Sequence, residues 1–363
     1  MARLGDVCTK GTSNIAQKDL EGHGGNYPIY GASGFIANVD FYQQENPYIA
    51  VVKDGAGIGR IMKLPAKSSV IGTMQYIIPD DTVDISYLAY AMEHMNLSKY
   101  FTGATIPHIY FKDYQKEELP LPCLDEQRKI AAVLDKVSDL IAKRQQQLDK
   151  LNEAVKARFV EIFGEPDENP KHWQEDELSH HLKVIGGYAF KSDGFTDEGI
   201  PVLRIGNINS GHFLPVNMVY WPDDLALARY KVFPGDLVMS LTGTVGKDDY
   251  GNVCILGADY DEYYLNQRNA KLSIEKSLNK CYFSELLKFP RIKKRLTGIS
   301  RGIRQANISN KDILTLRVPM PPIELQEQFA AFVEQTEKTK IIISHSLEKL
   351  ETLKKALMQE YFG

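Results

Sequence analysis

Residues 119–164 read LPLPCLDEQRKIAAVLDKVSDLIAKRQQQLDKLNEAVKARFVEIFG, and residues 318–363 read VPMPPIELQEQFAAFVEQTEKTKIIISHSLEKLETLKKALMQEYFG. A constant offset of 199 aligns the two stretches without a gap over 46 positions, of which 13 are identical. The identities include a Pro-x-Pro at the start and a Phe-Gly pair at the end. Two unrelated charged helices would share scattered residues, but not the same beginning and the same end. We interpret the two stretches as copies of one duplicated segment.

Each copy has the pattern of one long coiled-coil helix. Prolines precede it and a glycine closes it. In between, the seam positions follow alternating steps of four and three, which is a heptad repeat. The span from Ile130 to Phe163 is 34 residues, or about 50 Å of helix at roughly 1.5 Å per residue. Both seams contain polar residues, so we expect the helices to pair with each other; the alternative is two surface helices on separate domains. The seam positions are Ile130, Leu134, Val137, Ile141, Arg144, Leu148, Leu151, Val155, Arg158 and Ile162, then Phe329, Val333, Thr336, Lys340, Ile343, Leu347, Leu350, Lys354, Leu357 and Tyr361.

The segments that precede the two helices, 1–118 and 165–317, have a different character. Both are rich in Gly, Tyr, Asn and Pro and contain short β-branched runs such as Tyr48–Val52 and Val253–Leu256. These runs predict strands bounded by turns, followed late in each segment by a helical stretch, at about 84–99 and 279–296. The offset of 199 still aligns 103–113 with 302–312, and residues 57–60 resemble 244–247 at another offset. The chain is therefore predicted to run globular domain, helix, globular domain, helix.

Composition excludes several classes of protein. The chain has 363 residues, with 43% hydrophobic and 25% charged residues, as in ordinary folded proteins of two or three domains. The longest apolar runs are too short to span a bilayer, and the first residues lack the apolar core of a signal peptide. Four cysteines lie far apart with no CxxC pair, which favours the reducing cytoplasm and argues against a structural zinc site.

Local charge is more informative than the net charge of −4. Residues 288–317 contain nine lysines and arginines against a single acidic residue, Asp312. Gln305, Asn307, Ser309 and Asn310 lie among these basic residues. A basic patch with amide side chains is typical of a nucleic-acid contact, because cations hold phosphates and amides bond base edges. The alternative is that residues 291–295 are only the solvated face of a helix.

Enzyme motifs fail on their spacing. Asp54–Gly59 has glycines but not the Gly-x-Gly-x-x-Gly spacing, and the strand-like residues 60–64 that follow it predict a hairpin instead of a phosphate loop. The sequence contains no G-x-x-x-x-G-K-[ST] loop for ATP. Asn46-Pro-Tyr48 lacks a proline of the adenine methyltransferase box. No histidine has a carboxylate or cysteine at metal-ligand spacing, and nothing combines a nucleophile with a base. We predict a binding protein with no catalytic residues and no metal site.

The whole pattern resembles the DNA specificity subunit of type I restriction–modification systems. The resemblance rests on 119–122 and 318–321 with the glutamines that follow, on the repeated leucines of both helices, and on the loops 103–109 and 302–308. Leu265–Arg268 is also similar to a stretch common in the target recognition domains of this family.

The resemblance implies an α+β fold with an internal pseudo-two-fold repeat. Two globular mixed α/β target recognition domains, 1–122 and 165–321, would be separated by two long antiparallel coiled-coil helices, 123–164 and 322–363. Each domain would read one half of a bipartite double-stranded DNA site. Two modification subunits would dock on the helices and methylate adenine, and restriction subunits would add translocation and cleavage. S-adenosylmethionine, ATP and Mg are then expected on these partners, with no cofactor in this chain and no membrane contact, in the cytoplasm.

By the repeat, we predict DNA-binding residues at corresponding loops of both domains. Arginine pairs with guanine and Asn or Gln with adenine in the major groove, whereas lysine holds phosphates. Tyr76 and Tyr110 are better explained as core. The predicted residues are Lys53, Arg60, Thr73, Gln75, Thr105, His108 and Lys112 in the first domain, and Arg204, Thr244, Lys247, Asn266, Gln267, Arg268, Arg301, Arg304, Gln305 and Asn307 in the second.

Two other classes of function stay open at this point. The chain could be a non-catalytic coiled-coil scaffold or an RNA-binding protein, or it could be a methyltransferase in its own right. Binding of S-adenosylmethionine by the isolated chain would identify the methyltransferase. A specificity subunit should instead co-purify with a separate methyltransferase.

Overall fold

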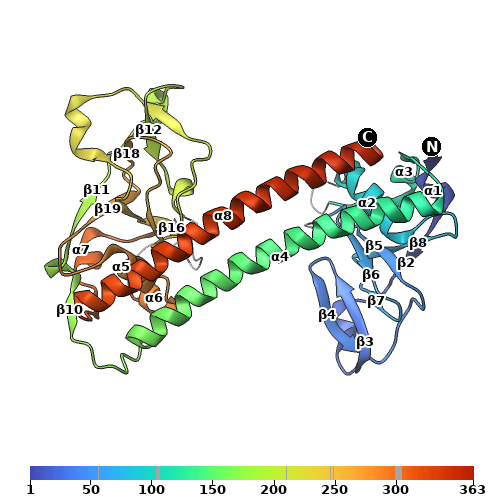
Figure 1. Ribbon diagram of the computed structural model, residues 1–363, viewed down its shortest axis with the longest axis horizontal. Coiled ribbons are helices and arrows are strands. Elements are labelled where there is room, and N and C mark those ends of the chain that lie inside the picture. The colour runs from blue at the N-terminus through green and yellow to red at the C-terminus, as the bar shows by residue number, and fades with distance from the viewer. Residues whose placement is uncertain (56, 104–106, 210, 246, 248, 299–304) are drawn as a thin grey trace. The chain divides into compact units, whose positions relative to one another are not determined.

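The computed structural model describes residues 1–363 except 56, 104–106, 210, 246, 248, 299–304 and the side chain of residue 305. The chain divides into two compact units. Unit 1 comprises residues 1–147 and 343–363, and unit 2 comprises residues 148–342. Each unit therefore contains one globular part and one half of each long helix (Figure 1).

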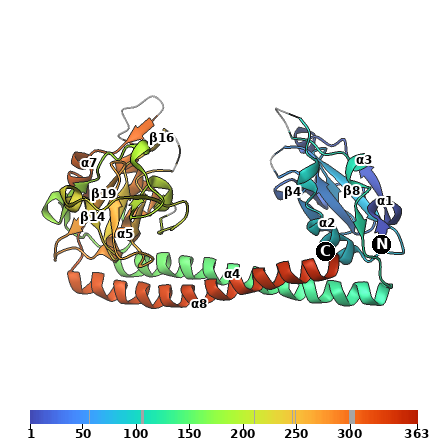
Figure 2. The ribbon, with the colours of Figure 1, turned by 90° about the horizontal axis from the view of Figure 1, so that it is seen from above.

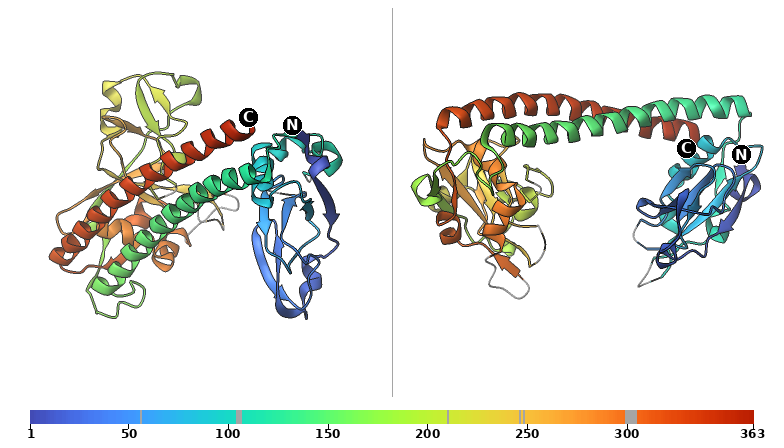
Figure 3. Two further views of the ribbon diagram at one scale, coloured as in Figure 1. Left: turned by 45° about the vertical axis from the view of Figure 1, so that its right-hand side comes forward. Right: turned by 90° about the horizontal axis from the view of Figure 1, so that it is seen from below.

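The two predicted helices are present, each 40 residues long. They are α4, Leu124–Phe163, and α8, Ile323–Phe362. Every position of both predicted heptad seams is buried or half-buried. In unit 1, the beginning of α4 shares a core with the end of α8; in unit 2, the end of α4 shares a core with the beginning of α8. In unit 2 the two half-helices run side by side (Figure 3). In each unit the beginning of one helix packs with the end of the other, as antiparallel helices do, so the predicted pairing is confirmed.

Unit 1 is built on a sheet in the strand order β2-β8-β5-β6, with every neighbouring pair antiparallel. A second sheet has the order β4-β3-β7, and β1 pairs with β9. In β5 every residue is buried, as expected for a central strand covered on both faces. The elements are β1 Ala2–Arg3, α1 Leu4–Val7, β2 Cys8–Thr12, β3 Gly24–Gly31, β4 Gly34–Val39, β5 Tyr48–Val52, β6 Ile61–Leu64, β7 Ser69–Val70, β8 Met74–Pro79, α2 Ile85–His94, α3 Phe111–Tyr114 and β9 Glu118–Leu119.

Unit 2 repeats this plan. Its main sheet has the order β11-β19-β15-β17, its second sheet the order β13-β12-β18-β14, and β10 pairs with β21. The elements are β10 Glu175–Glu177, β11 Leu182–Gly186, β12 Ile200–Leu203, β13 Val219–Trp221, β14 Lys231–Val232, β15 Leu237–Ser240, β16 Thr242–Thr244, β17 Val253–Ile255, β18 Tyr263–Leu265, β19 Asn269–Ile274, α5 Lys280–Leu287, α6 Pro290–Thr297, β20 Gln305–Asn307, α7 Asn310–Leu314 and β21 Arg317–Pro319.

The duplication therefore extends beyond the helices into the globular parts. In the main sheet of unit 1, β8 lies between β2 and β5, and β5 pairs in turn with β6. In the main sheet of unit 2, β19 lies in the same way between β11 and β15, and β15 pairs in turn with β17. In both second sheets a strand pairs antiparallel with its successor and parallel with a later strand. The predicted hairpin after Asp54 is confirmed, because β5 and β6 pair antiparallel.

One buried glutamine per unit ties the long helix to the globular part. Gln127 is fully buried; its Oε1 accepts a hydrogen bond from the Asp84 backbone N–H at 2.8 Å, and its Nε2 donates to the Thr82 and Pro122 carbonyls. Asp84 is also the N-cap of α2, since its carboxylate accepts from backbone N–H groups of the first turn. The joint therefore fixes the start of α4 against the start of α2.

Unit 2 repeats the joint. Gln326 is fully buried, accepts from the Asn279 N–H at 2.8 Å, and donates to the Pro321 and Ser277 carbonyls. Asn279 is the N-cap of α5. Gln127 and Gln326 are one of the identical pairs of the repeat. Both side chains are buried, and the oxygen and nitrogen of each amide are hydrogen-bonded, which explains why a glutamine stands at the start of both helices.

The helical stretches predicted near 84–99 and 279–296 are present but divided. In unit 1, α2 ends at His94 and a short 3₁₀ turn, Leu97–Tyr100, follows. In unit 2, Pro290 begins a separate helix, α6, because proline has no N–H for the preceding turn. None of the helices in the described part of the chain carries an apolar stretch capable of crossing a membrane.

Candidate nucleic-acid interface

The same tight turn follows the parallel strand of the second sheet in both units. In unit 1, the β7–β8 turn (residues 71–73) is closed by the Met74 N–H donating to the Ile71 carbonyl at 3.0 Å, and Lys53 N donates to the Thr73 carbonyl at 3.0 Å. In unit 2, residues 266–268 form the β18–β19 turn, where Asn269 N donates to Asn266 O at 2.9 Å and Leu241 N to Arg268 O at 2.8 Å. The backbone bonds make the two turns structurally equivalent.

The equivalent turns carry unlike side chains. In unit 1 the turn reads Ile-Gly-Thr, and in unit 2 it reads Asn-Gln-Arg. Gln267 and Arg268 are exposed and Asn266 is half-buried. The amides and guanidinium of unit 2 match the donor and acceptor patterns of adenine and guanine, whereas only Thr73 offers a polar side chain in unit 1. A common backbone thus presents two different chemistries.

A short two-stranded ribbon, β16–β20, begins beside the turn of unit 2. Thr242 pairs with Asn307 and Thr244 with Gln305. The ribbon lies at the end of unit 2 away from its half-helices (Figure 2). Thr244, Lys247 and Asn307 are exposed. The backbone N–H of Thr244 donates to Asp249 at 2.8 Å, which lowers the pKa of that carboxyl.

Unit 1 has a shorter version of the ribbon. Asp54 forms an isolated antiparallel bridge with His108, and the offset of 199 aligns His108 with Asn307. The His108 ring is hydrogen-bonded to the Asp54 carboxylate. Tyr110 is 47% exposed, with its ring centroid 4.1 Å from that of His108 and the Lys112 ammonium 5.2 Å above it. The prediction that Tyr110 belongs to the core is therefore wrong, whereas Tyr76, 1% exposed, is a core residue.

A cavity of about 530 Å³ opens beside the turn of unit 2. Arg204, Asn266, Gln267 and Arg268, all predicted as DNA-binding residues, lie along it. Sequence reasoning missed its other walls, which come from the loop 190–195 and from the long β12–β13 loop. Their sequence signal was only a high content of Gly, Asn and Phe. These further lining residues are Phe190, Ser192, Phe195, Ile205, Gly206, Asn207, Val216 and Asn217.

Helix α6 presents part of the basic stretch to solvent. Arg291, Lys294 and Arg295 are exposed. Lys293 is different, since its side chain is 8% exposed and its ammonium donates to Asn252 Oδ1 at 2.6 Å. The basic face predicted for 291–295 therefore consists of residues three and four positions apart, as a helix with one buried side requires.

The structure corrects one predicted site residue and constrains two others. Gln75 is 4% exposed and its amide donates to the Tyr114 hydroxyl, so it is a core residue; β8 is a central strand, which the local sequence did not reveal. Lys53 is mostly covered and lies 4.0 Å from the Asp54 carboxylate. Arg60 is exposed, with its guanidinium bonded to the Ala32 carbonyl at 2.7 Å.

The remaining predicted residues divide by what the structure describes. Thr73 and Lys112 are exposed, as expected of DNA-binding residues. Thr105, Arg301 and Arg304 lie outside the described residues, as does the Gln305 side chain. The Gly59 N–H donates to the Val52 carbonyl at the end of β5, and the Gly251 N–H donates to the Ser240 carbonyl at the end of β15. Gly59 is therefore equivalent to Gly251, and this equivalence replaces the weak alignment of 57–60 with 244–247.

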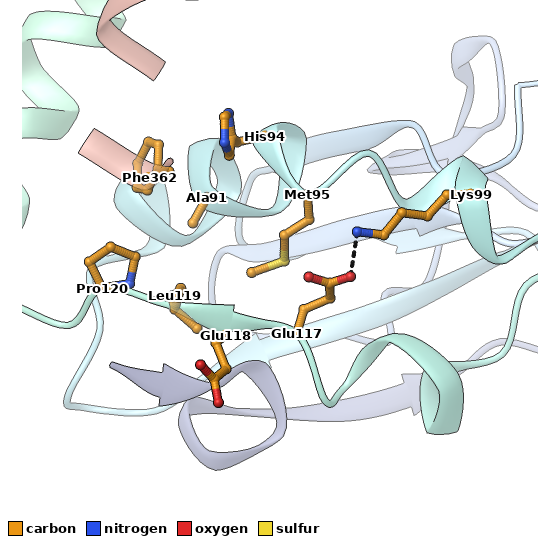
Figure 4. A pocket seen from close by; sticks show the side chains of 9 residues that line it. All are labelled: Ala91, His94, Met95, Lys99, Glu117, Glu118, Leu119, Pro120 and Phe362. Carbon is orange, nitrogen blue, oxygen red and sulfur yellow. Dashed lines mark ion pairs between the residues drawn. The ribbon is translucent and has the colours of Figure 1, made fainter. Parts of the chain in front are cut away.

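A second cavity, of about 230 Å³, lies in unit 1 between α2, β9 and the end of α8 (Figure 4). The Lys99 ammonium and Glu117 carboxylate on its wall form an ion pair of 2.5 Å. Burial raises the pKa of Glu117, but the ion pair with Lys99 and a hydrogen bond from the Tyr100 hydroxyl together outweigh it, so the pKa is lowered. His94 and Phe362 line the other side. Lys99 and Glu117 neutralise each other, and Glu118 adds one further carboxylate to the lining. The described lining does not combine a nucleophile with a base.

Metal-binding geometry is also not found in the described part of the chain, where no group of three His, Cys, Asp or Glu side chains is placed to hold an ion. The thiols of Cys8 and Cys254 are buried, and burial raises the pKa of each to about 12. Neither is a reactive thiolate near neutral pH.

Two α/β units built on one duplicated plan, each with exposed polar side chains on equivalent turns, are typical of a nucleic-acid recognition protein. The sequence matches the family model of the type I restriction modification DNA specificity domain over residues 1–153 and 170–352. The chain belongs to this family, and its function at that level is recognition of DNA sequence.

Individual relatives agree. The specificity subunit of the type I restriction enzyme MjaVIII from Methanocaldococcus jannaschii is 26% identical over 99% of this chain and 90% of its own. The EcoBI specificity subunit of Escherichia coli is 22% identical over 72% of this chain and 61% of its own. The crystal structure of a type I restriction–modification S subunit from M. genitalium has the same fold, with a TM-score of 0.63, 15% identity, and coverage of 100% of this chain and 95% of that one. The predicted family and fold class are confirmed.

Proposed function

We propose that this chain recognises a bipartite double-stranded DNA site, with unit 1 reading one half and unit 2 the other. One observation carries the proposal: equivalent turns, held by the same backbone hydrogen bonds, present Ile-Gly-Thr in unit 1 and Asn-Gln-Arg in unit 2. A duplicated frame with unlike side chains is suited to two different half-sites, since base edges are distinguished by hydrogen-bonding groups.

In unit 2, the β16–β20 ribbon and the β18–β19 turn would enter the major groove. That groove is about 12 Å wide in B-DNA and admits a two-stranded ribbon. Thr244 and Asn307 on the ribbon and Gln267 on the turn are exposed there and would bond base edges. Lys247 would hold a phosphate. In unit 1, Thr73, His108 and Lys112 would act at the equivalent places.

The chain is the non-catalytic recognition component of its system. We propose that two modification subunits bind along α4 and α8 and methylate adenine, and that restriction subunits join them. S-adenosylmethionine, ATP and Mg would then be bound by those subunits. A DNA-reading subunit of this kind would act in the cytoplasm, where its DNA is. The exposed polar positions of α4 and α8 give such partners a long surface to bind.

The test is the DNA motif itself. The chain is expressed with its modification subunits, and modified adenines in the cell's DNA are located by sequencing. The wild type should give a motif with two fixed halves and an unread spacer. Gln267→Ala should relax the second half and leave the first intact, and Thr73→Ala should affect only the first. Gln174→Ala changes an exposed glutamine of unit 2 that lies directly before β10 and outside both long helices; it is the matched control and should change neither half.

A motif with one continuous block, or one that changes in both halves with Gln267→Ala, would contradict the assignment of one half to each unit. Binding of double-stranded RNA as tightly as DNA would favour the RNA-binding alternative. Binding of S-adenosylmethionine by the isolated chain would favour a methyltransferase.

A further inference from the structure

We infer that the 530 Å³ cavity of unit 2 is a binding site for the sugar–phosphate backbone of the DNA strand flanking the groove that the β16–β20 ribbon enters. This inference rests on the proposed function and adds a contact that reads no base. The volume falls within the range of about 300–1,000 Å³ typical of ligand sites.

Shape distinguishes this hollow from the protruding ribbon, although Asn266 and Gln267 of the turn also line it. The grooves of DNA are concave and take protruding elements such as a ribbon or a turn, whereas the backbone is a ridge and fits a hollow. The cavity and the ribbon are adjacent, since Leu241, directly before β16, donates its N–H to the carbonyl of Arg268 on the cavity wall. A ribbon in the groove therefore brings the backbone ridge beside that groove to the cavity.

The chemistry of the walls matches a phosphodiester. Arg204 and Arg268 line the cavity, and none of the described lining residues is acidic. Arg204 is held in place, because its Nη2 donates to the Asn217 carbonyl. Arg268 is exposed, and no described residue bonds its guanidinium. Arginine binds phosphate through two parallel N–H groups, which gives both charge and geometry.

Apolar and backbone surfaces complete the site. Phe195 is half-buried on one wall and would contact the sugar. Gly206 is exposed, and a side chain added there would meet no atom within 4 Å, so this wall leaves room for a strand to approach the protein backbone.

Unit 1 is built differently at this place. Its equivalent strands, β3 and β4, are joined by a tight turn with Gly31 paired to Gly34, whereas the β12–β13 connection of unit 2 spans residues 204–218. The loop that builds the cavity is therefore particular to unit 2. The backbone contact should favour the half of the DNA site read by unit 2 without changing which bases are read.

The experiment uses the complex of this chain with its modification subunits and a DNA duplex carrying the motif identified by sequencing. Affinity is measured from 0.05 to 0.3 M salt for wild type, Arg268→Gln and Arg229→Gln. Arg229 is an exposed arginine of unit 2 that stacks on Tyr230, so its variant removes the same charge elsewhere. Arg268→Gln should weaken binding about five- to tenfold at 0.15 M salt and reduce the slope of log K against log[salt] by about 0.9, the contribution of one phosphate. The methylation motif should stay unchanged.

Duplexes with single neutral methylphosphonates then locate the contact. At one or two adjacent positions of the second half-site, the substitution should weaken wild type as much as Arg268→Gln does, and should have no further effect on that variant. Arg204→Lys, which keeps the charge but loses the planar fork, should show part of the same loss.

A changed base preference in the second half-site with an unchanged salt slope would overturn the inference, because Arg268 would then read a base. An effect of Arg268→Gln no larger than that of Arg229→Gln would overturn it as well. Both results leave a wild-type complex that binds a bipartite motif, so they are distinct from failure of the proposed function, in which no two-part motif is found.

Discussion

The buried glutamine at the start of each long helix offers a direct test of how the frame is held. Gln326→Leu replaces the amide by an apolar side chain of similar size. The Asn279 N–H and the Pro321 carbonyl, now bonded to Gln326 at 2.8 Å, then lose their partners at a site where the side chain is fully buried. Water cannot easily reach these groups, so their desolvation is left uncompensated.

The magnitude follows from these two bonds. Leaving one buried backbone group without a partner costs about 1–3 kcal/mol, so the loss of two should lower the free energy of unfolding by roughly 2–6 kcal/mol. The third contact, to the Ser277 carbonyl, is 3.4 Å long and should add little. For a unit of this size, 1 kcal/mol corresponds to about 2–4 °C, so a loss of 3 kcal/mol should lower the melting temperature by roughly 6–12 °C.

Urea unfolding of the full chain followed by circular dichroism measures the loss, and amide hydrogen exchange shows where it occurs. The Asn279 amide and the first turn of α5 should exchange faster in the variant. Gln328→Leu, two positions along the same helix and exposed, should change stability by less than about 0.5 kcal/mol. Equal stability of the two variants, or unchanged exchange at Asn279, would refute the role given to the joint.

Three further outcomes are expected. His94→Phe should raise the free energy of unfolding of the full chain in urea by about 0.5–2 kcal/mol, because the phenyl ring fills the cavity of unit 1 and unit 2 has Phe289 at the equivalent position. A loss of stability would show that the cavity cannot accept the ring. Asp176 has a pKa lowered from 3.8 to about 2, chiefly because its carboxylate accepts the Glu177 N–H and bonds the adjacent histidines. Because the pKa of Asp176 is lower in the folded chain than in the unfolded chain, its ionised carboxylate stabilises the fold above about pH 4, and this stabilisation is lost as the pH falls through about 2. The stability advantage of wild type over Asp176→Asn should therefore shrink between pH 4 and pH 2, and an advantage that stayed constant would contradict this. Tyr110→Ala should weaken binding to the first half-site about three- to tenfold with the melting temperature unchanged, and an effect confined to the second half-site would be incompatible with its place in unit 1.

The long helices could be predicted from sequence because every cause of their structure is local or repeated. Proline and glycine set their ends, and the heptad seam matches the burial found at all its positions. The strands at 48–52 and 253–255 were also predicted, since each combines β-branched residues with flanking turns. These signals depend on neighbours in the chain.

The errors arise where tertiary neighbours decide. Gln75 comes two residues after exposed Thr73, but it lies on β8, a central strand between β2 and β5, and its side chain is buried. Tyr110 is large and apolar, yet it lies on a loop edge against His108. The cavity of unit 2 joins the segment 190–217 to the turn 266–268, which is distant in sequence, so spacing alone could not reveal it.

The distribution of burial explains how one frame can carry different side chains at equivalent turns. Residues of the joint, such as Gln127 and Gln326, are fully buried, and changing either costs kilocalories. Gln267 and Arg268 are exposed on a turn whose backbone bonds use no side chain, and substitutions at such positions usually change stability by less than about 0.5 kcal/mol. Side chains on the turn can therefore be exchanged with little effect on folding, while those of the joint cannot. The joint accordingly keeps the same residue in both units, Gln127 and Gln326, whereas the equivalent turn positions carry Thr73 and Arg268.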